Sequence, residues 1–277
     1  MVNGVTEIIA HIGFPTHAFK APLIYNPWFE RAGVNAIVLP MSCRAEDFAD
    51  FFRAVFKLTN TRGAIITMPH KVTATSLVDE LLSTASIAGA CNAVRRGLDG
   101  RLQGEMFDGE GFVRGVRRKG LALKGCRALV VGSGGVGSAI AASLAAAEVR
   151  ELLLFDVNSS SSEHLAERLR KHHPALQVKT GSNDPAGLDL VVNATPLGMN
   201  KGDQLPVDVS RLAAHTFVGE VVMRTEITEF LAAAKARGCA VQIGSDMLFE
   251  QIPAYLEFFG FPTTTPDVLR SIATLAY

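Results

Sequence analysis

One glycine-rich loop restricts the fold of this chain more than any other feature. The loop follows an apolar stretch, Arg127 to Val131, and leads into the Ala-rich stretch Ser138 to Ala147. Its six residues are Gly132, Ser133, Gly134, Gly135, Val136 and Gly137. A strand, a glycine loop and a helix in this order are typical of a dinucleotide-binding βαβ unit, because glycines let the backbone approach a pyrophosphate at the helix N-terminus. The alternatives are a simple glycine turn and an S-adenosylmethionine-binding domain.

Asp156 supports the dinucleotide interpretation. It stands at the end of the next predicted strand, Glu151 to Phe155. An acidic side chain at that place can accept hydrogen bonds from both ribose hydroxyls of NAD. The sequence therefore predicts a nicotinamide dinucleotide as the cofactor.

The composition excludes several other classes of protein. The 277 residues are 48% hydrophobic and 19% charged, and 27 Lys and Arg balance 27 Asp and Glu. No basic field is available to attract nucleic acid or a membrane surface. The four cysteines are far apart, no His/Asp/Glu cluster has metal spacing, and no signal peptide or long apolar run is recognisable. We expect a soluble cytoplasmic protein without a metal.

Strand-like and helix-like segments alternate along the chain, which predicts an α/β fold with parallel sheets covered by helices. In the N-terminal part the expected strands are Glu7–Ile12, Ala36–Pro40, Ala64–Met68 and an edge pair, Ala93–Arg96 with Leu102–Glu105; the expected helices are Leu23–Ala32, Ala45–Leu58 and Ser76–Leu82. The Phe-rich stripe from Phe48 to Phe56 is interpreted as core. The predicted domains are residues 1–109, a dinucleotide domain at 110–240, and C-terminal helices at 241–277.

Several short motifs stand in a specific order. They are Gly13-Phe14-Pro15 with Lys20-Ala21-Pro22, Thr67-Met68-Pro69-His70-Lys71, Ala88-Gly89-Ala90-Cys91-Asn92, Gly104 with Asp108-Gly109, the glycine loop, Asn193-Ala194-Thr195-Pro196, and Gly244-Ser245-Asp246-Met247-Leu248 with Gln251. In this order and spacing the chain resembles the shikimate/quinate dehydrogenase family over nearly its whole length. The resemblance implies an N-terminal substrate domain, a Rossmann domain, C-terminal helices that return to the first domain, and an active site in the cleft between the domains.

The resemblance also implies roles for individual residues. Lys71 and Asp108 match the catalytic pair, which can hold an alcohol oxygen and move its proton. Alone, Lys71 would be interpreted as a solvated lysine and Asp108 as a turn residue, but together in two matched motifs they favour catalysis. The matched substrate-binding positions are Phe19, Ala21, Thr67, Asn92 and Gln251. The matched cofactor-binding positions beyond the loop are Asp156, Asn193, Thr195 and Gly244.

The sequence departs from the family's pattern at the substrate end. Phe19 and Ala21 stand where the family has two serines that hold the substrate carboxylate, Ile65 replaces an asparagine, and Met223 replaces a tyrosine. We therefore expect an altered, more apolar carboxylate end, unless Lys20, Thr16 or His17 supplies a substitute. His70 is expected to be a wall or surface residue rather than a catalytic acid.

Cofactor choice and function follow from the same comparison. Many family members carry an Asn-Arg-Thr-like turn whose arginine pairs with the 2′-phosphate of NADP, whereas this chain has Asp156-Val157-Asn158. NAD is expected to be preferred, with NADP possible because Ser159 to Ser162 can hydrogen-bond a phosphate. The predicted function is oxidation or reduction of a small cyclic hydroxy acid by a monomer or homodimer. The alternative is a regulatory or sensor protein that binds a dinucleotide with little turnover.

Overall fold

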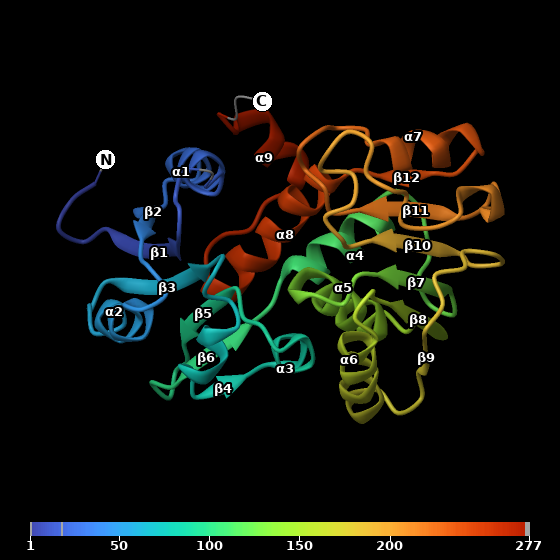
Figure 1. The fold of residues 1–277 in the computed structure, drawn as a ribbon. Helices are drawn as coiled ribbons and strands as arrows, with labels where there is room; N and C mark the ends of the chain where they lie inside the picture. Colours follow the sequence, from blue (N-terminus) through green and yellow to red (C-terminus); the bar gives the residue numbers. More distant parts are fainter. Residues whose placement is uncertain (1, 18, 275–277) are drawn as a thin grey trace. The chain divides into compact units, whose positions relative to one another are not determined.

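The chain folds into two compact units, which are described separately (Figure 1). The structure is a computed structural model and describes residues 2–17 and 19–274. The first unit consists of Met1–Phe107 with Ile252–Tyr277, and the second of Asp108–Gln251. Helix α8 (Gly244–Phe259) runs through the division between Gln251 and Ile252.

The first unit is built on a mixed six-stranded sheet. Its strands are β1 (Glu7–Gly13), β2 (Ala36–Ser42), β3 (Thr61–Ile66), β4 (Glu80–Leu81), β5 (Ala93–Arg96) and β6 (Leu102–Glu105). The order is β2-β1-β3-β5-β6-β4; β2, β1 and β3 are parallel, and β5 is antiparallel to both of its neighbours. The helical elements are α1 (Pro22–Arg31), α2 (Phe48–Val55), the 3₁₀ turn η1 (Thr73–Ser76), α3 (Ser83–Ala88) and α9 (Pro266–Ile272).

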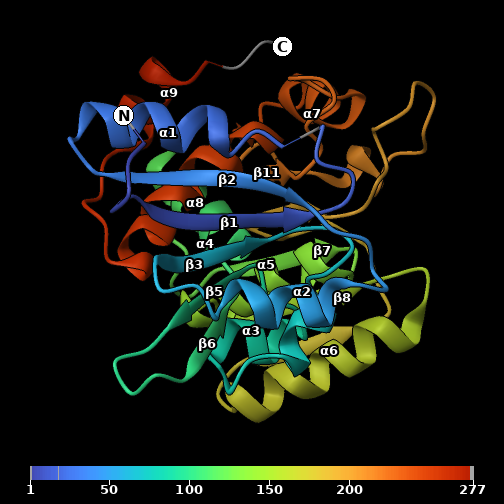
Figure 2. The ribbon, with the colours of Figure 1, turned by 90° about the vertical axis from the view of Figure 1, so that its left-hand side faces the viewer.

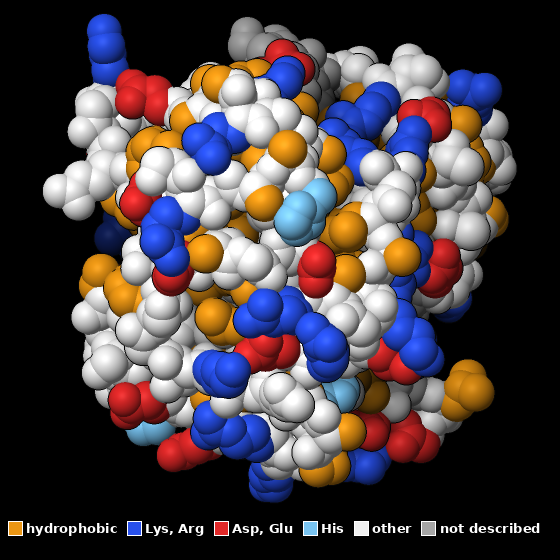
Figure 3. Space-filling model, turned by 90° about the vertical axis from the view of Figure 1, so that its right-hand side faces the viewer, with side chains coloured by type: hydrophobic (Ala, Val, Ile, Leu, Met, Phe, Trp, Pro, Cys, Tyr) orange, Lys and Arg blue, Asp and Glu red, His pale blue; other side chains and the backbone are white. Residues whose placement is uncertain are grey.

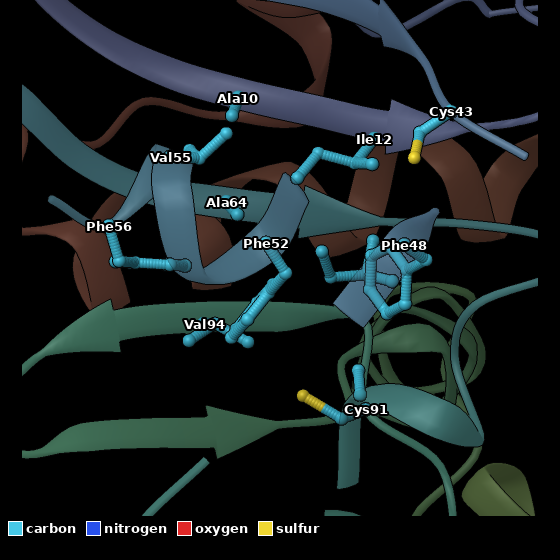
Figure 4. Packing of buried hydrophobic residues seen from close by; sticks show 12 residues of the cluster. Ala10, Ile12, Cys43, Phe48, Phe52, Val55, Phe56, Ala64, Cys91 and Val94 are labelled. Carbon is cyan, nitrogen blue, oxygen red and sulfur yellow. The ribbon is translucent and has the colours of Figure 1, made fainter. Parts of the chain in front are cut away.

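Helix α2 covers one face of this sheet and identifies which side chains of β1 and β3 lie on that face. Phe48 and Phe52 are completely buried against Ala10, Ile12 and other strand residues of the same cluster (Figure 4). The prediction that the Phe-rich stripe is core is confirmed. Because side chains alternate along a strand, the residues between these positions on β1 and β3 point to the opposite face. On β1 and β3, which run side by side in Figure 2, these are Ile9, His11, Gly13, Gly63 and Ile65.

The C-terminal segment of the first unit is tied to its N-terminal strands and helices. Trp28 Nε1 donates a hydrogen bond to the Pro262 carbonyl at 3.3 Å, and Arg62 Nε donates one to Phe259 at 2.6 Å. Segments far apart in the sequence therefore share one unit.

The second unit contains a fully parallel six-stranded sheet. Its strands are β7 (Arg127–Val131), β8 (Glu151–Phe155), β9 (Gln177–Thr180), β10 (Leu190–Asn193), β11 (Phe217–Glu220) and β12 (Val241–Gln242), in the order β12-β11-β10-β7-β8-β9. Its helical elements are α4 (Asp108–Arg118), α5 (Gly135–Ala146), α6 (Ser159–His172), η2 (Val209–Arg211), α7 (Glu229–Ala236) and the first half of α8. The order reverses direction between β7 and β10, as in a Rossmann fold, where the ligand binds at that point. The predicted α/β class is confirmed.

Two local predictions differ from the structure, and some of its elements were not predicted. Ser76 to Leu82 is not a helix, because β4 forms there and pairs with β6. That pairing also places β4, rather than the β5–β6 pair, at the edge of the sheet. Helices α3 and α4 and strand β9 were not predicted.

Charged side chains of both signs share the surface, as the balanced composition predicts. On the face seen in Figure 3, Lys and Arg side chains are interspersed with Asp and Glu side chains. Within residues 2–17 and 19–274, no helix combines the length and the apolarity needed to cross a bilayer. In the same residues, no three His, Cys, Asp or Glu side chains are grouped so that they could hold a metal ion.

Candidate functional site

The glycine loop of the second unit connects β7 to α5 and requires glycine at both ends. Gly132 has φ of +102°, and a Cβ there would lie 2.8 Å from the Ala194 backbone. A Cβ on Gly137 would overlap the carbonyl oxygen of Gly132. A larger residue at position 132 would therefore push the loop away from the end of β10. A larger residue at position 137 would push α5 away from the loop.

The middle of the loop is open and fits a phosphate group. Nothing lies within 4 Å of a Cβ built on Gly134 or Gly135, and Gly134 is the N-cap of α5. Neither glycine is required by the protein's own packing, but both leave backbone exposed at a helix N-terminus. That arrangement suits a group that approaches the backbone closely and accepts hydrogen bonds, such as a pyrophosphate.

Asp156 lies directly beside this loop. Its Oδ2 accepts a hydrogen bond from the Ser133 backbone amide at 2.7 Å, and its Oδ1 accepts one from Asn158 at 2.9 Å. The hydroxyl oxygen of Ser133 is buried without a hydrogen-bond partner. The strand end that carries Asp156 is thus hydrogen-bonded to the loop that would hold the cofactor.

The carboxyl ends of β10 and β11 supply the other side of the same sheet edge. Asn193 Oδ1 accepts hydrogen bonds from the backbone amide of Thr195 at 3.1 Å and from its hydroxyl at 2.6 Å. Asn193 pairs in register with Glu220, whose Oε2 accepts a hydrogen bond from Thr228 at 2.9 Å. Burial raises the pKa of Glu220 to about 7, although hydrogen bonds from Thr228 and Asn193 oppose the shift. The motif comparison missed Glu220, because burial at a strand end is not visible in a sequence.

Helix α8 begins at the same edge of the second unit. A Cβ on Gly244 would overlap the Val222 carbonyl, so only glycine allows this approach. Farther along α8, Gln251 packs against Gly111 of α4 and keeps a buried Oε1 without a hydrogen-bond partner. An unsatisfied amide oxygen is consistent with a ligand contact at Gln251.

In the first unit, Lys71 follows β3 and is fixed through its backbone. Its carbonyl accepts a hydrogen bond from the Cys91 amide at 2.8 Å. The neighbouring His70 is buried, stacks on Phe48 with ring centroids 4.0 Å apart, and hydrogen-bonds the Cys43 carbonyl at 2.8 Å. His70 is therefore a packing residue that holds the segment before Lys71.

Asn92 fixes the residue that precedes Asp108. Its Oδ1 accepts a hydrogen bond from the Phe107 amide at 2.9 Å, and its side chain is buried. Asp108 is the buried first residue of α4, where the helix N-terminus favours a negative charge. Cys91 and Asn92 thus connect the Lys71 segment to the chain that enters Asp108.

Two of the predicted substrate-binding residues, Phe19 and Thr67, lie at the carboxyl end of β1. A Cβ on Gly13 would lie 2.8 Å from Phe19 Cζ and would overlap Thr67 Cγ2, so both side chains lie over Gly13. Phe19 stacks on His11, with ring centroids 4.0 Å apart and an angle of 23° between the planes. Ala21 is the N-cap of α1 and offers no side-chain hydrogen bond. His11 was not among the predicted site residues.

Comparison with known proteins agrees with this geometry. The family described as "Shikimate dehydrogenase substrate binding domain" matches residues 12–94. The chain is 35% identical over 254 residues to "Shikimate dehydrogenase (NADP(+))" of Rubrobacter xylanophilus, covering 90% of this chain and 89% of that one. The chain belongs to the shikimate dehydrogenase family. The predicted family and its oxidoreductase class are confirmed.

Two solved structures resemble the chain over nearly its whole length. Quinate dehydrogenase from Corynebacterium glutamicum in complex with NAD has a TM-score of 0.86 at 28% identity, covering 96% of this chain and 98% of that one. The ligand-free 5-ketofructose reductase of Gluconobacter sp. strain CHM43 has a TM-score of 0.88 at 25% identity, covering 98% and 99%. The names of solved structures similar to this chain therefore refer to different substrates.

Proposed function

We propose that this family member interconverts an alcohol and a ketone on a small polyhydroxylated ring, with a nicotinamide dinucleotide as the second substrate. The hydrogen bonds that carry the proposal join Cys91 to the Lys71 carbonyl and Phe107 to Asn92 Oδ1. They tie the lysine segment to the residue before Asp108, the other member of the proposed catalytic pair. The open Gly134 and the neighbouring Asp156 support cofactor binding by the second unit.

Each member of the pair has a chemical task. The dinucleotide supplies hydride exchange at the carbinol carbon. Lys71 Nζ donates a proton to the ketone oxygen in reduction and takes up the hydroxyl proton in oxidation. The Asp108 carboxylate accepts a hydrogen bond from the reacting hydroxyl and orients it toward the lysine. Such positioned acid–base groups contribute roughly 10²–10⁴-fold to a rate.

The remaining matched residues would orient the substrate. Thr67, Asn92 and Gln251 carry a hydroxyl or an amide, which can both donate and accept hydrogen bonds to ring hydroxyls. At the other end, Phe19 and Ala21 offer no hydroxyl for a carboxylate. We infer that the substrate is a cyclic hydroxy acid whose carboxylate is held less tightly than the family pattern provides.

A neutral sugar ketone is the second candidate, because Phe19 and Ala21 lack carboxylate donors. The name of the Gluconobacter relative, 5-ketofructose reductase, refers to a substrate of this kind. Both candidates use the same alcohol–ketone chemistry and differ only at the substrate end.

The test is a panel of shikimate, quinate and 5-ketofructose, each with NAD(H) and NADP(H), followed by absorbance of the reduced nicotinamide. We expect turnover of at least one probe and a shikimate KM well above the micromolar range. A low-micromolar shikimate KM would refute the weakened carboxylate end. Tight dinucleotide binding without turnover of any probe would favour the sensor alternative.

A further inference from the structure

The face of β1 opposite α2 carries a buried histidine that the mechanism above does not use. His11 is 5% exposed, and its Nδ1 is enclosed without a hydrogen-bond partner. An unsatisfied buried nitrogen destabilises a protein, and native structures contain few of them. His11 therefore differs from His70, whose ring nitrogen is bound to a carbonyl in the core of the same unit.

The position of His11 points to the substrate end of the first unit. His11 pairs in register with Ile65 of the neighbouring strand, so the two side chains lie on one face. The next residue on that face of β1 is Gly13, over which Phe19 and Thr67 gather. Ligands of open α/β sheets bind beyond the carboxyl ends of the strands, and Gly13 is the last residue of β1. The imidazole is the polar side chain that faces Ile65, at the position where the family has an asparagine.

The charge state of the ring defines what it can bind. Burial, together with the positive charge of Lys71, lowers the pKa of His11 to about 4. The imidazole is therefore neutral near pH 7, with one nitrogen as donor and one as acceptor. A neutral ring suits a hydroxyl or carbonyl oxygen and offers no positive charge to a carboxylate.

We propose, on the basis of the oxidoreductase function above, that His11 is a substrate-contacting residue that binds an uncharged hydroxyl or carbonyl group through Nδ1. Phe19 is partly exposed and stacks on the imidazole. This contact supplies a polar partner at a place where the side chains of Phe19, Ala21 and Ile65 offer none.

Two variants of the full chain test the proposal. His11→Leu removes the nitrogen and keeps an apolar side chain in the core, and His11→Asn keeps a polar atom close to the place of Nδ1. KM and kcat are measured with shikimate, quinate and 5-ketofructose, and binding of the same probes is measured by calorimetry. His215→Leu, at an exposed histidine of the second unit, is the matched control.

We expect His11→Leu to raise KM roughly threefold to tenfold for the probe that wild type turns over, the scale of one hydrogen bond. kcat should change less, and His11→Asn should recover part of the loss. The thermal midpoint of His11→Leu should not fall, because the substitution removes an unsatisfied polar atom. If His11 were only a packing residue, His11→Leu would have a lower thermal midpoint and an unchanged KM.

The outcomes separate this inference from the proposed function. Wild-type turnover together with an unchanged KM in His11→Leu overturns the role of His11 alone. A wild-type protein that neither binds nor turns over any of the three probes overturns both. A raised KM in His11→Leu with partial recovery in His11→Asn supports the contact.

Discussion

The Asp156 carboxylate accepts a hydrogen bond from the backbone amide of Ser133 at 2.7 Å, which ties the second strand of the Rossmann unit to its glycine loop. In this position the carboxylate lies beside the loop proposed to bind the pyrophosphate. A 2′-phosphate on the adenosine ribose would bring like charges together, whereas free ribose hydroxyls can donate to the carboxylate.

We therefore predict that wild type prefers NAD over NADP, and that Asp156→Asn lowers the ratio of the two kcat/KM values roughly tenfold by removing this repulsion. The ratio is measured with one active substrate. Glu163→Gln, which removes the same charge from an exposed position of α6, should leave it unchanged. A wild-type preference for NADP would contradict the prediction, and an unchanged ratio in Asp156→Asn would show that another group discriminates.

The glycine loop and its strand were predictable because the residues themselves dictate the geometry. Gly132 adopts a positive φ, and Gly137 has no room for a side chain. Both positions require glycine, so the residue type itself indicates the local geometry. The parallel sheet of the second unit was predictable from the alternation of strands and helices. Strand β9, in contrast, lies at the edge of the sheet and has only one buried residue, Val178, so it carries little apolar signal.

Helix α4 was not predictable from local propensity. It contains three glycines, which disfavour a helix, and each of them meets another element of the same unit. Side chains at Gly109, Gly111 and Gly115 would collide with α5, with α8 and with Gln242, respectively. Tertiary packing therefore overrides propensity here. The same limit applies to His11 and Glu220, because a sequence does not show which buried polar atoms lack partners.

Substitution of the proposed catalytic pair should separate chemistry from cofactor binding. Lys71→Ala and Asp108→Asn should each lower kcat by roughly 10²–10⁴-fold, because a positioned proton donor or acceptor is lost. Binding of the reduced dinucleotide, followed by its fluorescence, should persist. Lys57→Ala, at an exposed lysine of the first unit, serves as the control. Wild-type turnover in both variants would remove Lys71 and Asp108 from the mechanism.

Alanine substitutions at two glycines of the loop should have different effects on stability and on dinucleotide binding. Gly137→Ala places a methyl group on the Gly132 carbonyl, so we expect a loss of stability of roughly 2 kcal/mol or more. Gly134→Ala meets open space, so its cost should stay within about 1 kcal/mol, from a poorer N-cap. Its methyl group should nevertheless block the pyrophosphate and abolish dinucleotide binding. Denaturant unfolding and calorimetric titration with NAD measure the two effects, and normal NAD affinity in Gly134→Ala would argue against the loop as the phosphate site.

Glu220 should make the second unit less stable as the pH rises. Its pKa is raised from 4.5 to about 7, so the folded state holds a proton that the unfolded chain releases between these values. Unfolding then releases protons, and the free energy of unfolding falls across this window by roughly 3 kcal/mol and stays low above it. Glu220→Gln should remove this decline and be the more stable protein at pH 8, while the exposed Glu226→Gln should behave as wild type. Trp28, the single tryptophan, belongs to the first unit, so hydrogen exchange of the β10 and β11 amides is the suitable measurement. Equal pH profiles for wild type and Glu220→Gln would show that the carboxyl is ionised in the fold.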